Sequence, residues 1–258
     1  MTTAYVETGD RVRLAYETAG RGDPPLVFVH GWSGDRSSFA PQYAHFATRH
    51  AVAAVDLRGH GESARPEPAG GVYEVSAFAA DTLAVAAAAG LDRPVFVGHS
   101  LGALVALECV AAAGAARAAV LVDPAPVLSA SGKAYFADCA AAAEEDRDGS
   151  WRAEFVTGLL LPTDTVRRDE LIATAYALPP PVAGAALRAI ARYDAAAALD
   201  RLAVPVLVIG ARGIESGLRR DDSLTKGQTV GAGHFPHLEV PDQVNAMIER
   251  FLALNGPG

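Results

Sequence analysis

The sequence predicts an α/β fold with a mostly parallel sheet that is covered by helices on both faces. Short apolar runs of strand length alternate with longer helix-like segments along most of the chain. Such alternation is typical of βαβ units, in which the crossover helices cover the faces of a parallel sheet. Two further observations are a sharp strand-to-helix turn at Gly98–Gly102 and a long interval, 124–203, without a convincing strand.

The chain opens with two short segments that predict an antiparallel pair, Ala4–Glu7 and Val12–Glu17. After them, apolar runs recur at intervals that leave room for crossover helices. The expected later strands are Leu26–Val29, Ala51–Val55, Pro94–Val97, Ala119–Val122, Val206–Ile209 and Gln228–Val230. The expected helices start at about Ser37 and otherwise span Val75–Ala89, Ala103–Val110 and Val240–Leu254.

The interval 124–203 predicts a helical cap inserted after the strand that ends at Val122. Prolines at 162 and 179–181 break it into pieces of helix length. We therefore expect a core formed by residues 1–123 and 204–258, with the cap between them. The helical segments expected in the cap are Lys133–Glu145, Trp151–Leu160, Thr165–Tyr176 and Pro181–Ala191.

The composition suits one α/β domain with an insertion. The chain has 258 residues, 50% of them hydrophobic, and a formal net charge of −8 with a pI of about 5.3. No basic stripe is present, so a nucleic acid is not an expected partner. Neither a secretory signal nor an apolar run of membrane-spanning length is found, so no membrane association is expected. Cys109 and Cys139 are too few for a disulfide framework, and a cytoplasmic setting is expected. The oligomeric state is left open.

The most informative motif is Gly98-His99-Ser100-Leu101-Gly102, which has the form G-x-S-x-G. It lies between an expected buried strand and an expected helix, which is the setting of a nucleophile elbow. The two outer glycines avoid the clash that a Cβ would cause where the turn approaches its neighbours. We predict that Ser100 is a nucleophile.

A serine nucleophile needs a neighbouring base, and the chain has seven histidines. His234 is preferred because its glycine-rich loop, Gly231–Phe235, directly follows the last expected strand and can face the elbow. His60, in the loop Asp56–Ser63, is expected to be structural. His45 and His50 are expected on or beside the first covering helix. His99 is expected to point away from the face of Ser100, and His237 is expected at the rim of the site or at the start of a helix.

A second polar turn, His30-Gly31-Trp32, follows the strand that ends at Val29. The backbone N–H of Trp32 can converge with the N–H of Leu101, the residue after the nucleophile, to form an oxyanion hole. The alternative is an ordinary glycine turn without chemistry. The side chains of His30 and Trp32 are not needed for this role and are free to line a substrate pocket.

With these motifs in this order, the chain resembles proteins of the α/β-hydrolase fold. The resemblance rests on His30-Gly31-Trp32, the loop at 56–63, the elbow and Gly233-His234, covers nearly the whole chain and is weakest in the cap. It implies an eight-stranded, mostly parallel sheet and acyl-transfer chemistry with no cofactor and no metal. A serine nucleophile, rather than an aspartate, implies cleavage of esters, lactones, thioesters or, less often, C–C bonds.

The chain departs from this family at the acid of the triad. The usual Asp follows the strand equivalent to Val206–Ile209 in a Gly-x-x-Asp pattern, and Gly213 occupies its position here. Asp123 is the preferred acid because it directly follows the preceding strand, where a minority of the fold carries the acid. The remaining candidates are Glu215, Asp221 and Asp222.

The function predicted from these residues is hydrolysis of a small apolar carboxylic ester or lactone through an acyl-enzyme. Ser100, His234 and Asp123 are expected to act as nucleophile, base and acid. Apolar cap residues indicate a substrate pocket over Ser100, and its candidate lining residues are Trp151, Phe155 and Tyr176. One alternative is a C–C bond hydrolase or cofactor-independent lyase on the same fold. Another, of a different class, is a non-catalytic receptor for a small molecule.

Overall fold

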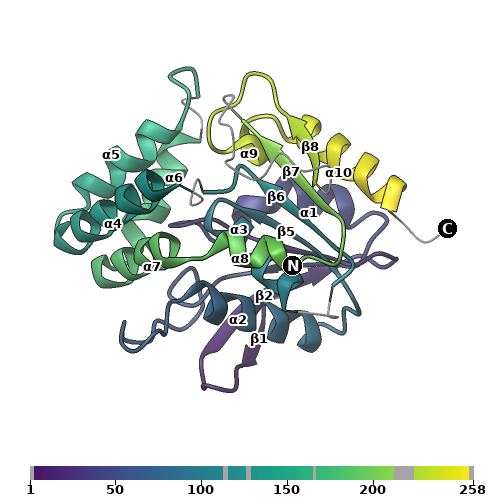
Figure 1. Cartoon of the computed structure of the whole chain (residues 1–258), viewed down its shortest axis with the longest axis horizontal. Coiled ribbons are helices and arrows are strands. Elements are labelled where there is room, and N and C mark those ends of the chain that lie inside the picture. Colours follow the sequence, from purple (N-terminus) through teal and green to yellow (C-terminus); the bar gives the residue numbers. More distant parts are fainter. Residues whose placement is uncertain (1–2, 113–115, 126–128, 165–166, 212–223, 256–258) are drawn as a thin grey trace.

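The strands form a single eight-stranded sheet in the computed structural model, which describes residues 3–112, 116–125, 129–164, 167–211 and 224–255. The strands are β1 (Ala4–Glu7), β2 (Arg13–Ala19), β3 (Leu26–Val29), β4 (Val52–Val55), β5 (Val95–His99), β6 (Ala118–Val122), β7 (Val206–Gly210) and β8 (Leu224–Gln228). Their spatial order is β1-β2-β4-β3-β5-β6-β7-β8. β2 runs antiparallel to both of its neighbours, β1 and β4, and all other neighbouring strands are parallel, so the predicted mostly parallel α/β fold is confirmed (Figure 1).

Helices alternate with these strands and also fill the interval between β6 and β7. They are the 3₁₀ helix η1 (Arg36–Phe39), α1 (Ala40–Phe46), α2 (Val75–Ala88), α3 (Leu101–Ala111), α4 (Ala130–Glu145), α5 (Ser150–Leu159), α6 (Arg168–Ala177), α7 (Pro180–Arg192), α8 (Ala195–Asp200), α9 (Pro236–Glu239) and α10 (Pro241–Asn255). The helices that the sequence predicts for the sheet and the cap are therefore all present, with ends that differ by a few residues.

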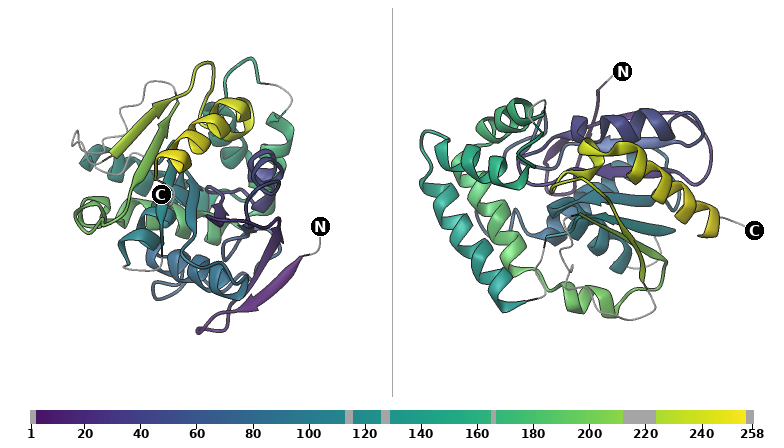
Figure 2. Two further views of the ribbon diagram at one scale, coloured as in Figure 1. Left: turned by 90° about the vertical axis from the view of Figure 1, so that its right-hand side faces the viewer. Right: turned by 90° about the horizontal axis from the view of Figure 1, so that it is seen from above.

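Both faces of the sheet are covered by helices, with α1 and α10 on one face and α2, α3 and α8 on the other (Figure 2). Every residue of β3 to β7 is buried. Successive side chains of a strand point to opposite faces, so Phe28 packs with Phe46 and Ile248 while Val29 packs in the cluster that contains Phe78. This two-sided burial explains why the central strands are continuous apolar runs.

The register of the parallel strands brings three chain segments to one edge of the sheet. His99 of β5 pairs with Val122 of β6, and Val122 pairs with Ile209 of β7. The residues that follow these strands, Ser100 and Asp123 among them, therefore emerge side by side at the carboxyl edge, where α/β sheets place their sites.

The cap consists of α4 to α7, which follow β6 and lie beyond one end of the sheet (Figure 2, right). Within it, α4 packs along α7, and α5 packs along α6. Helix α8 also falls within residues 124–203, but it packs against α3 on a face of the sheet. The domain boundary at residue 203 stays a prediction.

The expectation for the last strand was wrong in its position. The expected strand was Gln228–Val230, whereas β8 spans Leu224–Gln228 and pairs with β7. β8 is an edge strand of mostly polar and exposed residues, so it lacks the apolar run that marks the central strands. Val230 lies beyond it and is exposed.

The elbow glycines are required by close packing of backbone on backbone. A Cβ on Gly98 would lie 1.9 Å from the carbonyl oxygen of Gly102, and a Cβ on Gly102 would lie 2.2 Å from that of Val29. The start of α3 therefore rests directly on the end of β3, which brings the loop after Val29 next to the elbow.

We predict that Gly102→Ala lowers the free energy of unfolding by about 1–3 kcal/mol, because the new methyl group collides with backbone that cannot move cheaply. The matched control is Gly158→Ala in α5, where a Cβ meets nothing within 4 Å and should be neutral or stabilise by up to about 1 kcal/mol. Urea unfolding of both variants measures the difference. Equal effects of the two substitutions would contradict the packing argument.

Candidate functional site

Ser100 occupies the turn between β5 and α3 in a strained backbone conformation. Its φ is 52° and its ψ is −111°, outside the regions that a residue with a side chain usually adopts. The turn is held by the Ser100 N–H, which donates to the carbonyl oxygen of Val122 on β6 at 3.1 Å. Ser100 is almost fully buried, and it lines a cavity beneath the cap.

Asp123 and His234 form a hydrogen-bonded pair next to this turn. The Nδ1 of His234 lies 2.7 Å from Oδ2 of Asp123. The second carboxylate oxygen, Oδ1, accepts the N–H of Ala211 at 2.9 Å, and the Asp123 N–H donates to the carbonyl oxygen of Ile209 at 2.7 Å. The carboxylate is thus fixed by β7 on one side and points one oxygen at the imidazole. Asp123 also has a positive φ, 41°.

A cavity of about 150 Å³ joins these residues to the cap. Its lining residues are Trp32, Ser33, His99, Ser100, Ala125, Tyr135, Phe136, Phe155, Val156, Leu159, Leu187, Ile190, His234 and Phe235. Among these described lining residues none is Asp, Glu, Lys or Arg, and most are apolar. The cavity therefore favours an uncharged, largely apolar occupant.

Two backbone N–H groups near Ser100 have no hydrogen-bond acceptor in the part of the chain that the structure describes. Among the described residues, neither the N–H of Trp32 nor that of Leu101 donates to a protein acceptor. Gly102 packs against the carbonyl oxygens of Val29 and His30. This contact brings the loop that carries Trp32 next to the start of α3, where Leu101 lies. Free donors at the first turn of a helix suit a developing negative charge.

Trp32 also connects its loop to the cap through its side chain. The indole Nε1–H donates to the carbonyl oxygen of Ala183 on α7 at 3.0 Å. Its ring packs edge-on against Phe155, with 5.2 Å between ring centroids. One wall of the cavity is therefore shared between the core loop and α5.

Of the four side chains expected to bind substrate, the structure places Phe155 in the cavity lining and the other three elsewhere. Trp151 stacks on Phe155 and packs against Trp32, behind the lining residues rather than among them. Tyr176 is half-exposed on α6. His30 is fully buried, and its ring nitrogens are occupied by backbone, since Nδ1–H donates to the oxygen of Gly31 and Nε2 accepts the N–H of Leu57.

Lining residues that sequence reasoning missed come mainly from α4 and α7. Leu187 and Ile190 lie three positions apart on α7, the spacing that puts two side chains on one helix face. That spacing was a usable signal for a buried face. It carries no information on whether the face meets the core or a cavity.

Most of the remaining histidines are buried, and burial lowers their pKa values. Burial lowers the pKa of His60 and of His237 to about 3 and holds the pKa of His99 well below its usual value. His237 was expected at the rim, yet it is fully buried, and neither ring nitrogen has a hydrogen-bond partner. His99 was expected to point away from Ser100; its ring lies between those of His234 and His237, at 4.7 and 4.3 Å between centroids.

The sequence offers three other candidates for the acid. Glu215, Asp221 and Asp222 lie outside the described residues, as does Gly213 at the family's usual position.

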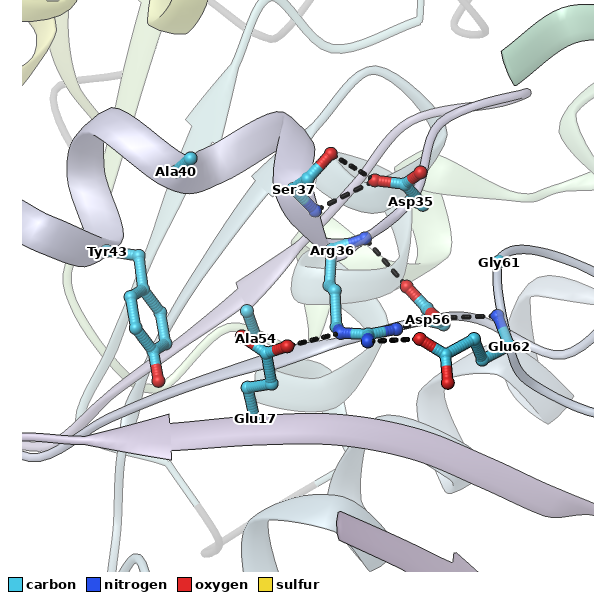
Figure 3. Close-up of a pocket in the computed structure, with 10 residues that line it drawn as sticks. All are labelled: Glu17, Asp35, Arg36, Ser37, Ala40, Tyr43, Ala54, Asp56, Gly61 and Glu62. Atoms are coloured by element: carbon cyan, nitrogen blue, oxygen red, sulfur yellow. Dashed lines mark hydrogen bonds and ion pairs between the residues drawn. The ribbon is translucent and has the colours of Figure 1, made fainter. Parts of the chain in front are cut away.

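An ion cluster secures the loop that carries Trp32. Figure 3 shows the Arg36 guanidinium between the carboxylates of Glu17 and Glu62, with Asp56 beside it. The buried Asp56 carboxylate accepts the N–H of Arg36 at 2.7 Å and that of Glu62 at 2.8 Å. These contacts join the loop after β3 to the loop after β4, and the three carboxylates of the cluster share the one Arg36 guanidinium. Asp56 is therefore structural.

Two kinds of feature are absent from the described ranges. No group of three or more His, Cys, Asp or Glu residues there is arranged to hold a metal ion. No helix there combines the length and the apolarity that crossing a membrane requires.

Comparison with known proteins identifies a family match over most of the chain. The family described as "Alpha/beta hydrolase family" matches residues 26–247. A non-heme chloroperoxidase from Burkholderia pyrrocinia is 36% identical over 130 residues, which cover 48% of this chain and 46% of that protein. The chain spans less than half the length of the first curated relatives it matches.

Solved structures resemble the whole chain. An esterase from Rhodococcus sp. ECU1013 is 25% identical, with a TM-score of 0.83 and coverage of 99% of this chain and 100% of that one. A thermophilic esterase from Thermogutta terrifontis is 23% identical, with a TM-score of 0.86 and full coverage of both chains. An enol-lactonase from Burkholderia xenovorans LB400 is 20% identical, with a TM-score of 0.83, covering 97% of this chain and 100% of that one. The last two likenesses concern the fold.

The buried, neutral His237 leads to a prediction on stability and pH. As pH falls below about 6.5 the unfolded chain binds a proton at this histidine, while the folded pKa of about 3 keeps the folded ring neutral. The free energy of unfolding therefore falls on acidification. The variant His237→Phe should keep the packing on Phe39. Between pH 6.5 and 5, the decrease in its free energy of unfolding should be smaller than that of the parent by roughly 2 kcal/mol. Urea unfolding across this range measures both slopes, and parallel slopes would contradict the prediction.

Proposed function

The chain belongs to the alpha/beta hydrolase family, and from that premise we propose that it hydrolyses a carboxylic ester or lactone through an acyl-enzyme on Ser100. The observation that carries the proposal is the 2.7 Å hydrogen bond between His234 and Asp123. That bond leaves Nε2 of the imidazole free, and His234 and Ser100 line the same cavity.

In the proposed first step, Ser100 Oγ attacks the carbonyl carbon of the substrate while His234 Nε2 removes the hydroxyl proton. The carbonyl π bond opens, and its electron pair moves to the oxygen. Asp123 holds the Nδ1–H tautomer of His234 and stabilises the imidazolium that forms. The oxyanion's electron pair then re-forms the carbonyl while the bond from its carbon to the alcohol oxygen breaks, and His234 gives the proton to that oxygen, which leaves as an alcohol.

The developing oxyanion is proposed to bind the N–H groups of Trp32 and Leu101. Neither donor has an acceptor among the described residues, and a donor preorganised for the transition state costs no rearrangement during the reaction. Water then attacks the acyl-enzyme, with His234 again as the base. The products are a carboxylic acid and an alcohol, which stay joined when the substrate is a lactone.

The comparisons support ester chemistry at the level of the family. The esterase from Rhodococcus covers nearly the whole chain at 25% identity, and the uncharged cavity lining suits a neutral ester or lactone better than a charged substrate.

The size of the cavity supports a compact substrate. Its volume is about 150 Å³, close to that of an engineered apolar cavity that binds benzene. Its lining includes three buried aliphatic residues, Leu187, Ile190 and Val156. We propose that the apolar group of the substrate is about the size of a six-carbon ring or a short chain.

The first experiment tests the three proposed catalytic residues. Ser100→Ala should abolish labelling by a fluorophosphonate and nearly all turnover of activated esters. Asp123→Asn should lower kcat by about 10⁴-fold, the loss that the equivalent change causes in a serine protease. The matched control is Asp194→Asn, because Asp194 caps α8 and does not line the cavity. Full turnover by the Ser100 variant, or equal losses in the two Asp variants, would contradict the assignment.

The second experiment tests the cavity as a limit on size. With nitrophenyl esters of increasing acyl length, kcat/KM should rise up to about four to six carbons, by roughly fourfold per buried methylene, and then fall. Leu187→Ala should move the optimum to longer chains. Leu171→Ala removes a buried cap leucine that does not line the cavity, and it should leave the optimum unchanged.

If acetates with increasing alkyl groups on the alcohol show the same optimum instead, the alcohol side occupies the cavity. A flat profile in both series would contradict a size limit.

A further inference from the structure

The backbone around His234 is held on all sides by groups that the proposed mechanism does not use. Glu239, on the short helix α9, accepts the N–H of Gly233 with Oε2 at 2.5 Å and the N–H of Phe235 with Oε1 at 3.0 Å. The two oxygens of one carboxylate therefore bridge the residues on either side of the base.

Two more contacts complete this support. The N–H of His234 donates to the carbonyl oxygen of Leu159 at the end of α5, at 3.0 Å. The carbonyl oxygen of His234 accepts a hydrogen bond from His99 Nε2–H at 2.7 Å. Since Leu159 and His99 also line the cavity, the base is anchored to its walls as well as to Glu239.

Gly233 shows how tightly the loop is fitted to the cap. A Cβ there would lie 2.8 Å from the carbonyl oxygen of Leu159 and 3.1 Å from Oε1 of Glu239. Only a glycine leaves room for both acceptors. The carboxylate bonds are charge-assisted and so stronger than bonds between neutral groups.

We propose that Glu239 is a positioning residue, whose carboxylate fixes the main chain on both sides of His234 and thereby aims the imidazole at Ser100. Asp123 holds the ring of His234, while Glu239 holds its backbone, so the two carboxylates act on different parts of one residue. The proposal rests on the proposed function. It goes beyond a helix-capping role, since a cap accounts for the bond to Phe235 at the start of α9 but not for the bond to Gly233.

Glu239→Gln tests the proposal because it keeps the size of the side chain but replaces one acceptor oxygen with an NH₂ group, so it can satisfy only one of the two N–H groups. We expect kcat to fall 10- to 100-fold, the loss that a small misplacement of a catalytic group can cause, with KM within about threefold of the parent. Glu239→Asp keeps both oxygens on a shorter stem and should lose less. The matched control is Glu249→Gln, at an ion pair with Arg49 between α10 and the end of α1, which should leave kcat unchanged.

Labelling by a fluorophosphonate separates positioning from folding. In Glu239→Gln the rate of labelling should fall in parallel with kcat, while the final labelled fraction equals that of the parent. A loss of labelled fraction together with a lower unfolding midpoint, or an unchanged labelling rate and kcat, would overturn the positioning role and leave the proposed function standing. A parent protein that resists labelling would overturn both.

Discussion

The site depends on one constraint, which is that β5 must turn into α3 within a single residue. That turn places Ser100 at a φ of 52° and presses Gly102 against the carbonyl oxygen of Val29. The strain is held by the rigid neighbours of the turn, including the hydrogen bond from Ser100 to Val122. The same close approach places the loop of Trp32 beside Leu101. The strained conformation of Ser100 and the positions of the two candidate oxyanion donors therefore depend on the same backbone contact.

The second constraint is the alignment of parallel strands. Because β5, β6 and β7 end in register, Asp123 emerges next to Ser100 and receives the N–H of Ala211 from the end of β7. Groups held by strands are more accurately placed than groups held by loops. His234 is the exception, since it lies on a loop, and its backbone is tied to α9, the cap and the elbow through Glu239, Leu159 and His99.

The core and the cap are connected by hydrogen bonds beside the cavity. Trp32 donates to Ala183 on α7, and His234 donates to Leu159 on α5, so a cap helix contacts each of two loops at the carboxyl edge of the sheet. The uncharged lining and the buried, neutral histidines make this region one of low polarity. In such surroundings a hydrogen bond to a developing charge is stronger than in water.

The sequence by itself determined the fold and narrowed the site, because both depend on local signals. Apolar runs define the central strands, prolines divide the cap helices, and a glycine-flanked serine between strand and helix marks the elbow. The sequence also limited the candidates for the acid to four residues, Asp123, Glu215, Asp221 and Asp222. Only the tertiary structure decided which polar groups meet. The bond between Asp123 and His234 joins residues 111 positions apart, and the burial of His237, the exposure of Tyr176 and the bridge formed by Glu239 depend on how helices pack. Such contacts leave no periodic trace in the chain, since they are set by the approach of elements that sequence alone does not place.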